Sequence, residues 1–333
     1  MHQFRRRTLL ERAFEWALAA SLGLASAGVA AQPGDAAYPV RPLRWVVPYS
    51  AGSFSDTLCR TLATDMAAQL GQPLVIENLP GAGGAIGTER ARTAAADGYT
   101  ILYAGSSAFA INVSLMKLNY DPLKDFRYVS LIGYTNYVLA AYPGAPFGDL
   151  AGLVASAKAA PGSLSFASPG NGTGSHLAME IFEKAAGIRL QHVPYKGSAP
   201  GVSDLVAGHV PLMLDPLSTL GPHIQAGRLR ALAVTGPRRM RELPAVPTFA
   251  ELGIEGLDAP LGWFGLVVPA GTPDAIVATL HAALGVALQR QAARLAELGV
   301  TPDFGSPEAF RSLVQHQIPR YRQLVQETGM KLD

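Results

Sequence analysis

Short apolar runs alternate with helical patterns along almost the whole chain, and this alternation limits the folds that the sequence can adopt. Strands are expected at Leu43–Val47, Leu74–Glu77, Thr100–Ala104, Tyr137–Ala141, Leu164–Ala167, Gln191–Val193, Leu212–Leu214, Leu229–Val234 and Leu266–Val268. Such alternation predicts α/β domains with parallel sheets. The 333 residues are too many for one compact core, so two domains are expected.

The helical patterns have recognisable ends. A helix is expected from about residue 55 to 70, where Gly71 ends it. A polar turn at Ser106-Ser107 follows the third strand, and the segment from Pro273 to Thr328 is helical. Pro319 lies inside the last helical pattern and is expected to kink or break that helix.

The first 31 residues have the pattern of a secretory signal peptide. Arg5–Arg7 form a basic start, and the stretch from Trp16 to Gly34 is uncharged and rich in small residues. Val29-Ala30-Ala31 places small residues at the positions that a signal peptidase reads. Residues 1–31 are therefore assigned to a cleaved signal peptide and the mature protein to the periplasm. A retained N-terminal anchor is the alternative, and Arg6-Arg7 weakly resembles a twin-arginine export signal.

Removal of this signal leaves a chain without net charge. The full chain has 27 basic and 25 acidic residues, and residues 1–31 contain four Arg and two Glu, which leaves 23 of each. No basic field therefore argues for nucleic acid or an anionic membrane, and no apolar run after residue 34 is long enough to span a bilayer. The single cysteine, Cys59, lies on an apolar helix face and is predicted to be a buried thiol.

The junction Ser50–Asp56 is the first candidate binding site. An apolar strand stops at Pro48, a loop of small and polar residues follows, and Ser55 or Asp56 is suited to capping a helix. A helix that begins here points free backbone N–H groups beyond the strand end, which favours an anion or a carboxylate. The alternative is an ordinary turn in which Asp56 only caps the helix.

The segment Ser168–His176 is the second candidate. It consists of small or polar residues up to a final His, so no bulky side chain blocks approach to the backbone. Binding sites in open α/β sheets lie beyond the carboxyl ends of strands, and two such loops, one per domain, could face each other across a cleft. A flexible surface loop is the alternative. Asp215 closes another strand, where its carboxylate could bind an ammonium or a hydroxyl in the cleft, or cap the next helix.

Other chemistries find little support. Gly81–Gly87 hints at a dinucleotide fingerprint, but no carboxylate follows the next strand, so a tight turn and close helix packing are expected. The chain has no Gly-x-Ser-x-Gly elbow, no His-Glu-x-x-His and no Cys pair, and neither a metal nor a cofactor is expected. An exported enzyme would have to rely on Ser53 with His176, which neither spacing nor motif supports.

Ordered motifs run from Tyr38 to the C-terminus. They include Val46-Val47-Pro48-Tyr49, Pro80-Gly81-Ala82-Gly83-Gly84, Asp97-Gly98-Tyr99-Thr100, Asn171-Gly172-Thr173, His192-Val193-Pro194-Tyr195-Lys196-Gly197 and Pro269-Ala270-Gly271-Thr272-Pro273. Together they resemble the Bug family, also called the TctC family, of extracytoplasmic solute receptors for tripartite tricarboxylate transporters. The resemblance implies a type II periplasmic binding-protein fold, with two α/β domains joined by two crossing strands. It also implies a non-enzymatic, monomeric receptor for a small carboxylate, which partners transporter membrane subunits.

The resemblance further implies domain limits and binding residues. Domain 1 would comprise residues 38–137 and 263–333, and domain 2 residues 138–262. In the family the acid is held mainly by the first loop and by the loop that starts the second domain, largely through backbone N–H groups and water. The corresponding residues here are Ser50, Ala51, Gly52 and Ser53, then Asn171, Gly172 and Thr173, with Asp56, Ser106, His176, Tyr195 and Asp215 as secondary candidates.

The first loop departs from the family pattern. Two adjacent glycines are common where this chain has Gly52-Ser53, and Phe54 follows. Serine adds a hydroxyl and removes backbone freedom, whereas the phenyl group either fills part of the pocket or favours an aromatic ligand. Ligand identity is therefore expected to depend on Ser53 and Phe54. A sensor receptor without a transporter remains an alternative to transport.

Overall fold

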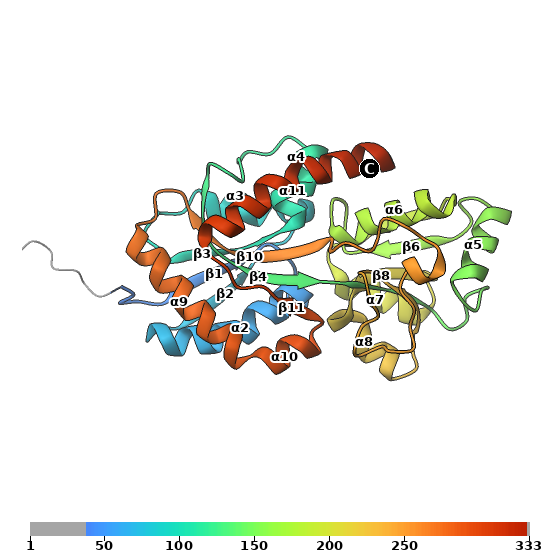
Figure 1. Ribbon diagram of the computed structural model, residues 1–333, viewed down its shortest axis with the longest axis horizontal. Coiled ribbons are helices and arrows are strands. Elements are labelled where there is room, and N and C mark those ends of the chain that lie inside the picture. The colour runs from blue at the N-terminus through green and yellow to red at the C-terminus, as the bar shows by residue number, and fades with distance from the viewer. Residues whose placement is uncertain (1–37, 332–333) are drawn as a thin grey trace, which may run out of the picture. The chain divides into compact units, whose positions relative to one another are not determined.

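The computed structural model describes residues 38–331, and the compact unit discussed below begins at Pro39. The predicted signal peptide, residues 1–31, lies outside the described residues. From Pro39 onward the chain forms two β-sheets, each with helices packed around it (Figure 1). We call each sheet with its helices a lobe. Within residues 38–331, no helix combines the length and apolar character needed to cross a membrane.

The first lobe is built on a six-stranded sheet with the order β11-β4-β10-β3-β1-β2. Its strands are β1 (Leu43–Val47), β2 (Leu74–Asn78), β3 (Thr100–Gly105), β4 (Phe126–Thr135), β10 (Gly262–Pro269) and β11 (Val300–Pro302). Its helices are α2 (Phe54–Leu70), η1 (Ala82–Gly84), α3 (Ala85–Arg92), η2 (Ser107–Ile111), α4 (Asn112–Leu115), α9 (Asp274–Arg290), α10 (Ala292–Glu297) and α11 (Pro307–Thr328).

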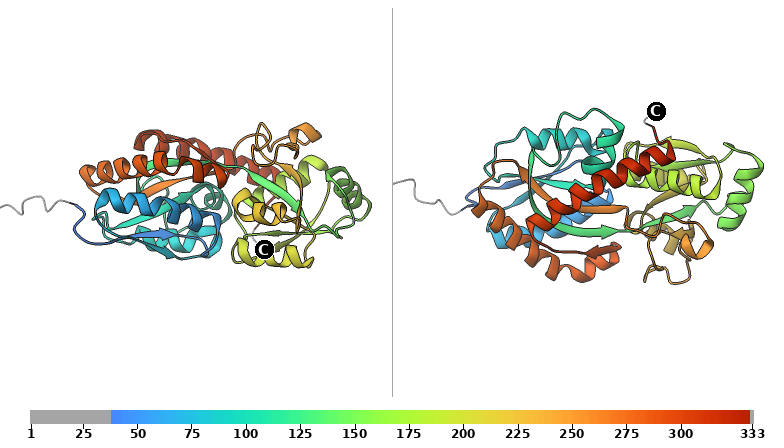
Figure 2. Two further views of the ribbon diagram at one scale, coloured as in Figure 1. Left: turned by 90° about the horizontal axis from the view of Figure 1, so that it is seen from below. Right: turned by 45° about the horizontal axis from the view of Figure 1, so that its top comes forward.

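The second lobe is built on a five-stranded sheet with the order β7-β6-β8-β5-β9. Its strands are β5 (Tyr137–Ala141), β6 (Ser165–Ser168), β7 (Gln191–Pro194), β8 (Leu212–Pro216) and β9 (Arg230–Val234). Its helices are α5 (Leu150–Ala159), α6 (Gly174–Ala186), α7 (Ser198–Ala207), α8 (Leu217–Gln225) and the short η3 (Ala250–Leu252). Figure 2 shows the two lobes from two further directions, with α11 running from the first lobe toward α6 of the second.

Both sheets are mixed, so the expectation of parallel sheets is wrong. β1 runs parallel to β2 and β3, and β6 runs parallel to β7 and β8, but β10 and β5 are antiparallel to their neighbours. The chain leaves β4 through Asn136 directly into β5 of the other sheet, and it returns through residues 235–261 into β10. These strands enter without a helical crossover, which is the connection that a parallel neighbour requires. The domain limits expected from the sequence remain a prediction.

The first helix ends as expected, at left-handed Gly71, but its start differs from the prediction. Ser53, and not Ser55 or Asp56, caps α2 by accepting a hydrogen bond from the backbone N–H of Asp56 at 3.3 Å. Cys59 is fully buried and unpaired, as predicted, and burial raises the pKa of its thiol. The Gly81–Gly87 segment forms a tight turn and a close helix contact. A Cβ at Gly87 would stand 2.6 Å from the carbonyl oxygen of Leu79.

Several local expectations need correction. The sequence analysis missed strand β4, and strand β11 interrupts the segment from Pro273 to Thr328, which was expected to be helical. The segment after Ser106 is a buried π-helical turn, η2, instead of a polar turn. Pro319 does not break α11, which continues to Thr328. Buried Val314 before it and Tyr321 after it anchor both halves of the helix, and this packing offsets the lost hydrogen bond.

Candidate functional site

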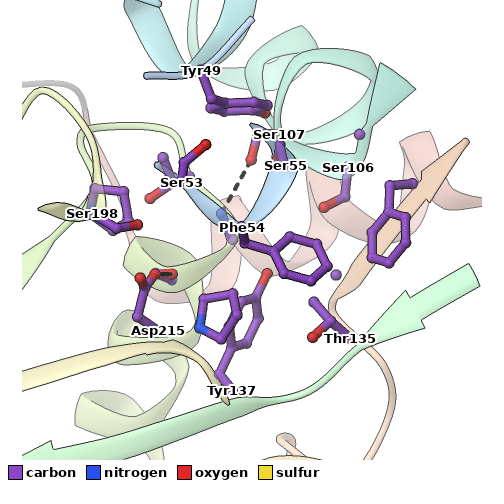
Figure 3. Close-up of a pocket in the computed structure, with 18 of the residues that line it drawn as sticks. Tyr49, Ser53, Phe54, Ser55, Ser106, Ser107, Thr135, Tyr137, Ser198 and Asp215 are labelled. Atoms are coloured by element: carbon purple, nitrogen blue, oxygen red, sulfur yellow. Dashed lines mark hydrogen bonds between the residues drawn. The ribbon is translucent and has the colours of Figure 1, made fainter. Parts of the chain in front are cut away.

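A small cavity of about 90 Å³ lies between the two lobes, at the ends of strands from both sheets (Figure 3). The first lobe contributes Tyr49, Ser53, Phe54, Ser55, Tyr103, Ser106, Ser107, Thr135, Trp263 and Phe264. The second lobe contributes Tyr137, Thr173, Gly174, Ser175, Gly197, Ser198, Asp215 and Pro216. Residues more than a hundred positions apart in the chain therefore share one small space.

Four helices of eight or more residues begin at this cavity. The N-cap residues of α2, α6, α7 and α8 are Ser53, Thr173, Gly197 and Pro216, and all four line the cavity. The first N–H groups of a helix have no partner within the helix, and the helix N-terminus carries partial positive charge. The converging helices therefore provide a positive environment without any cationic side chain.

The charged side chains of the lining are few. Among residues 38–331, no Arg, Lys or His lines this cavity, and Asp215 is its single carboxylate. The other polar side chains are the indole N–H of Trp263 and the hydroxyls of Ser53, Ser55, Ser106, Ser107, Thr135, Thr173, Ser175, Ser198 and three tyrosines. An anion here would be bound by backbone N–H groups and hydroxyls.

Asp215 lies at the end of β8 and is 1% exposed. The hydroxyl of Ser175 on α6 donates to its Oδ1 at 2.9 Å. Its Oδ2 is buried and finds no hydrogen-bond partner anywhere in the part of the chain that the structure describes. Burial raises the pKa of this carboxyl to about 6, and the hydroxyls of Ser198, Ser175 and Thr219 partly offset the effect.

Aromatic rings close the other side of the cavity. The ring of Phe54 meets Phe264 edge-on with centroids 5.1 Å apart, and Phe264 stacks on Tyr103 at 6.0 Å. Phe54 is 7% exposed and, in Figure 3, lies between Asp215 and Thr135. Burial raises the pKa of Tyr49 to about 12, so its hydroxyl remains protonated at neutral pH. Phe54 therefore occupies space at the cavity and gives it an apolar wall.

The departure at Ser53 is compatible with the backbone. Gly52 has φ 76°, which favours glycine, but Ser53 has φ −70° and ψ 165°, a conformation that any residue adopts. The Ser53 oxygen caps α2 as an acceptor, which leaves its hydroxyl proton free to donate toward the cavity.

Two hydrogen bonds join the lobes beside the cavity. Ser50 Oγ donates to the carbonyl oxygen of Lys196 at 2.8 Å, and the N–H of Gly174 donates to Ser107 Oγ at 3.2 Å (dashed in Figure 3). The first N–H of α6 is thus held by a side chain of the opposite lobe. Each of the two loops chosen from the sequence therefore contacts the opposite lobe, the first through Ser50 and the second through Gly174.

The predicted binding residues fall into three groups. Ser50, Asn171 and Tyr195 line a larger outer cavity of about 530 Å³, which shares Tyr49, Pro169, Thr173 and Gly197 with the inner one. Tyr195 donates its hydroxyl to Asp204 at 2.6 Å. Ser53, Phe54, Ser106, Thr173 and Asp215 line the inner cavity, whereas Ala51, Gly52, Asp56, Gly172 and His176 line neither.

Asp56 instead organises the first loop. It accepts hydrogen bonds from the N–H of Gly52 at 2.9 Å, from Asn78 at 3.0 Å and from Arg60 at 3.0 Å. Burial opposes ionisation, but these bonds and the Arg60 charge lower its pKa overall. Asp56 therefore neither lines the two cavities nor caps α2, because Ser53 is the cap and the Asp56 oxygens are engaged with neighbouring groups.

His176 faces away from the inner cavity. It is 2% exposed, stacks on His192 with ring centroids 3.8 Å apart, and has Nε2 3.3 Å from Glu180 Oε1. Ser53, in contrast, lines the inner cavity. The pairing on which an enzyme alternative depended is therefore not formed. Gly172 packs closely on Asn112, whose side chain an added Cβ would meet.

Several lining residues were not singled out from the sequence. They are Ser55, Ser107, Ser175, Ser198, Tyr137 and Trp263. Ser175 and Ser198 each stand in the first turn of a helix that follows a strand-end loop, and this position could have identified them. Tyr137 and Trp263 had no such signal, because their place depends on the strands that cross between the lobes.

Comparison with known proteins agrees with this architecture. The family model described as "Tripartite tricarboxylate transporter family receptor" (TctC) matches residues 58–330. Protein BugT of Bordetella pertussis is 39% identical over 314 residues, which cover 93% of this chain and 96% of that protein.

Two solved structures from Rhodopseudomonas palustris are similar in sequence and fold. Rpa4515 with adipate is 33% identical with a TM-score of 0.85, and the match covers 89% of this chain and 100% of that one. MatC with bound malate is 33% identical with a TM-score of 0.81, and the match covers 86% and 100%. The two mixed sheets have the type II periplasmic binding-protein architecture, as expected. The ordered motifs, the fold and these matches establish that the chain belongs to the TctC (Bug) family, whose members are solute-binding receptors and not enzymes.

Proposed function

We propose that this protein is a periplasmic receptor that captures a small carboxylate between its two lobes and delivers it to the membrane subunits of a tripartite tricarboxylate-type transporter. The observation that carries the proposal is the convergence of the N-termini of α2, α6, α7 and α8 on a cavity that no described cationic side chain lines. The relatives solved with adipate and with malate support a carboxylate as the ligand class.

The expected energies are sufficient for this role. Interaction of an anion with a helix N-terminus contributes about 0.3–1 kcal/mol when exposed and up to about 2 kcal/mol when partly buried. Hydrogen bonds to a charged group contribute about 1.5–3 kcal/mol each. Two or three N–H or hydroxyl donors from Ser53, Ser107 and the first turn of α6 would therefore hold one carboxylate without an arginine.

Cavity size favours a short acid. A water molecule needs about 10–15 Å³ measured in this way, so a cavity of about 90 Å³ corresponds to about six to nine waters. An acid of four or five carbons is near this limit. Phe54 is one of the walls that set this volume and packs on Phe264, so a bulkier aromatic acid would require its ring to move.

The proposed mechanism is closure of the two lobes on the ligand. The bonds Ser50–Lys196 and Gly174–Ser107 form only when the lobes meet. The connections at Asn136 and through residues 235–261 are the segments that a hinge would use. Closure would remove water from the cavity and strengthen each hydrogen bond to the bound acid.

Calorimetric titration of the mature protein with C3 to C6 mono-, di- and tricarboxylates tests the ligand class. We expect heat from at least one acid with one-to-one stoichiometry, and none from neutral sugars or from divalent metal salts. Heat from a sugar or a metal with none from any acid would refute the proposal.

Localisation and transport need separate tests. N-terminal sequencing of protein from the periplasmic fraction should find a chain that begins close to residue 32, and light scattering should find a monomer. Uptake of the identified acid in cells with the cognate membrane subunits should require this receptor. Tight binding without uptake would instead favour the sensor alternative.

A further inference from the structure

We propose that Asp215 determines the ligand specificity of the cavity by accepting a hydrogen bond from a hydroxyl or ammonium group on the bound acid. This inference rests on the proposed function and narrows its ligand class to hydroxy and amino carboxylates. An acid without such a donor would bind more weakly.

The first argument is geometric. Asp215 is 1% exposed, it lines the inner cavity, and its Oδ2 finds no partner among residues 38–331. In Figure 3 its carboxylate points into the space that Ser53, Ser198 and Phe54 surround. Buried polar atoms are almost always hydrogen-bonded, and Asp215 lines the cavity, so a donor on the bound ligand can satisfy Oδ2.

The second argument concerns the neighbours of Asp215. The groups that face it are the hydroxyls of Ser175 from α6, Ser198 from α7 and Thr219 from α8. None of these groups is positively charged at neutral pH. The N-termini of α7 and α8 begin at Ser198 and Leu217 and favour the ionised form of the carboxylate. Within residues 38–331, Asp215 Oδ1 accepts a hydrogen bond from Ser175, and Oδ2 is the oxygen that still has room for a donor.

The third argument is the division of the site. With α7 and α8 beside Asp215, the N-termini of α2 and α6 remain for the carboxylate of the ligand. A ligand with a donor near its carboxylate can satisfy both regions together. An unsubstituted dicarboxylate would leave Oδ2 unpartnered or place a second negative charge against it. A site built to bind a donor rejects analogues that lack one, because its own buried group is then left unsatisfied.

The experiment compares acids that differ only in the donor. Succinate, malate and aspartate form one series, and glutarate, 2-hydroxyglutarate and glutamate form another. Each is titrated calorimetrically into the wild-type protein, into Asp215→Asn and into Asp258→Asn, an exposed carboxylate used as the matched control. We expect the wild type and the control to bind a donor-bearing member about ten- to a hundredfold more tightly than the unsubstituted member.

In Asp215→Asn we expect this preference to fall below about threefold, while the unsubstituted acid binds at least as tightly as before, because one like charge is gone. Equal wild-type affinity within each series overturns the inference and leaves the carboxylate receptor intact. Failure of every acid to bind overturns both. Preservation of the preference in a folded Asp215→Asn also overturns the inference, and the wild-type comparison remains decisive if that variant does not fold.

Discussion

Asp215→Asn should stabilise the protein at neutral pH, although it removes a polar contact for the ligand. Burial raises the pKa of Asp215 from 3.8 to about 6. The folded state therefore binds this proton more tightly than the unfolded state. The stabilising contribution of that proton is complete below the unfolded pKa and is lost as pH rises from about 4 to about 6. Above that range the penalty for ionised Asp215 is constant.

The magnitude follows from the shift. One pKa unit corresponds to about 1.4 kcal/mol, so ionised Asp215 costs about 3 kcal/mol of folding free energy at pH 7.5. At pH 4 the same calculation leaves less than about 1 kcal/mol. Asparagine is nearly isosteric and neutral, and its carbonyl oxygen can still accept the hydrogen bond from Ser175. The variant should therefore gain up to about 3 kcal/mol at pH 7.5 and much less at pH 4.

Urea unfolding monitored by circular dichroism measures this difference at both pH values, without ligand. The free energy of unfolding of Asp215→Asn is compared with that of the wild type and of the exposed control Asp258→Asn. The control should differ from the wild type by less than about 0.5 kcal/mol. A variant that is destabilised at pH 7.5, or that changes equally at both pH values, would refute the argument that burial disfavours the ionised form of this carboxyl.

Three further substitutions test the closed site and its supporting loops. Ser107→Ala removes the acceptor for the N–H of Gly174. Ligand affinity measured by calorimetry should therefore fall about two- to tenfold, with little change in the free energy of unfolding. Unchanged affinity would argue against closure through this bond. Phe54→Ala should lower the free energy of unfolding in urea by about 3–5 kcal/mol, because the ring is buried. It should also improve the binding of longer acids relative to shorter ones. An unchanged order of affinities would exclude Phe54 as the residue that limits ligand size. Gly87→Ala should cost about 1–3 kcal/mol because its Cβ would meet Leu79; stability equal to the wild type would show that the turn can yield.

Long-range pairs explain why part of the site escaped prediction. Ser175 and Asp215 are 40 residues apart, and Ser107 and Gly174 are 67 residues apart. No periodicity or capping signal acts over such separations. The same limit hid the orientation of His176, because a helix start at Thr173 leaves open which way a first-turn side chain faces. From the sequence, Asp56 could be a ligand-binding residue or a helix cap. Its hydrogen bonds to Gly52 and Asn78 were needed to show that it holds the loop together instead.

The sequence by itself determined the α/β class, the burial of Cys59 and the family. It also showed that the segments Ser50–Asp56 and Ser168–His176 are loops that lead from a strand into a helix. These features depend on local signals: apolar period, helix caps, glycine positions and ordered motifs. Tertiary structure alone decided that both sheets are mixed, that Pro319 is tolerated in α11 and that four helix N-termini share one cavity. It also decided that Asp215 is buried there with one oxygen that finds no hydrogen bond among residues 38–331. The physical reason is that burial and hydrogen-bond satisfaction depend on which distant segments pack together, and this is a property of the folded chain as a whole.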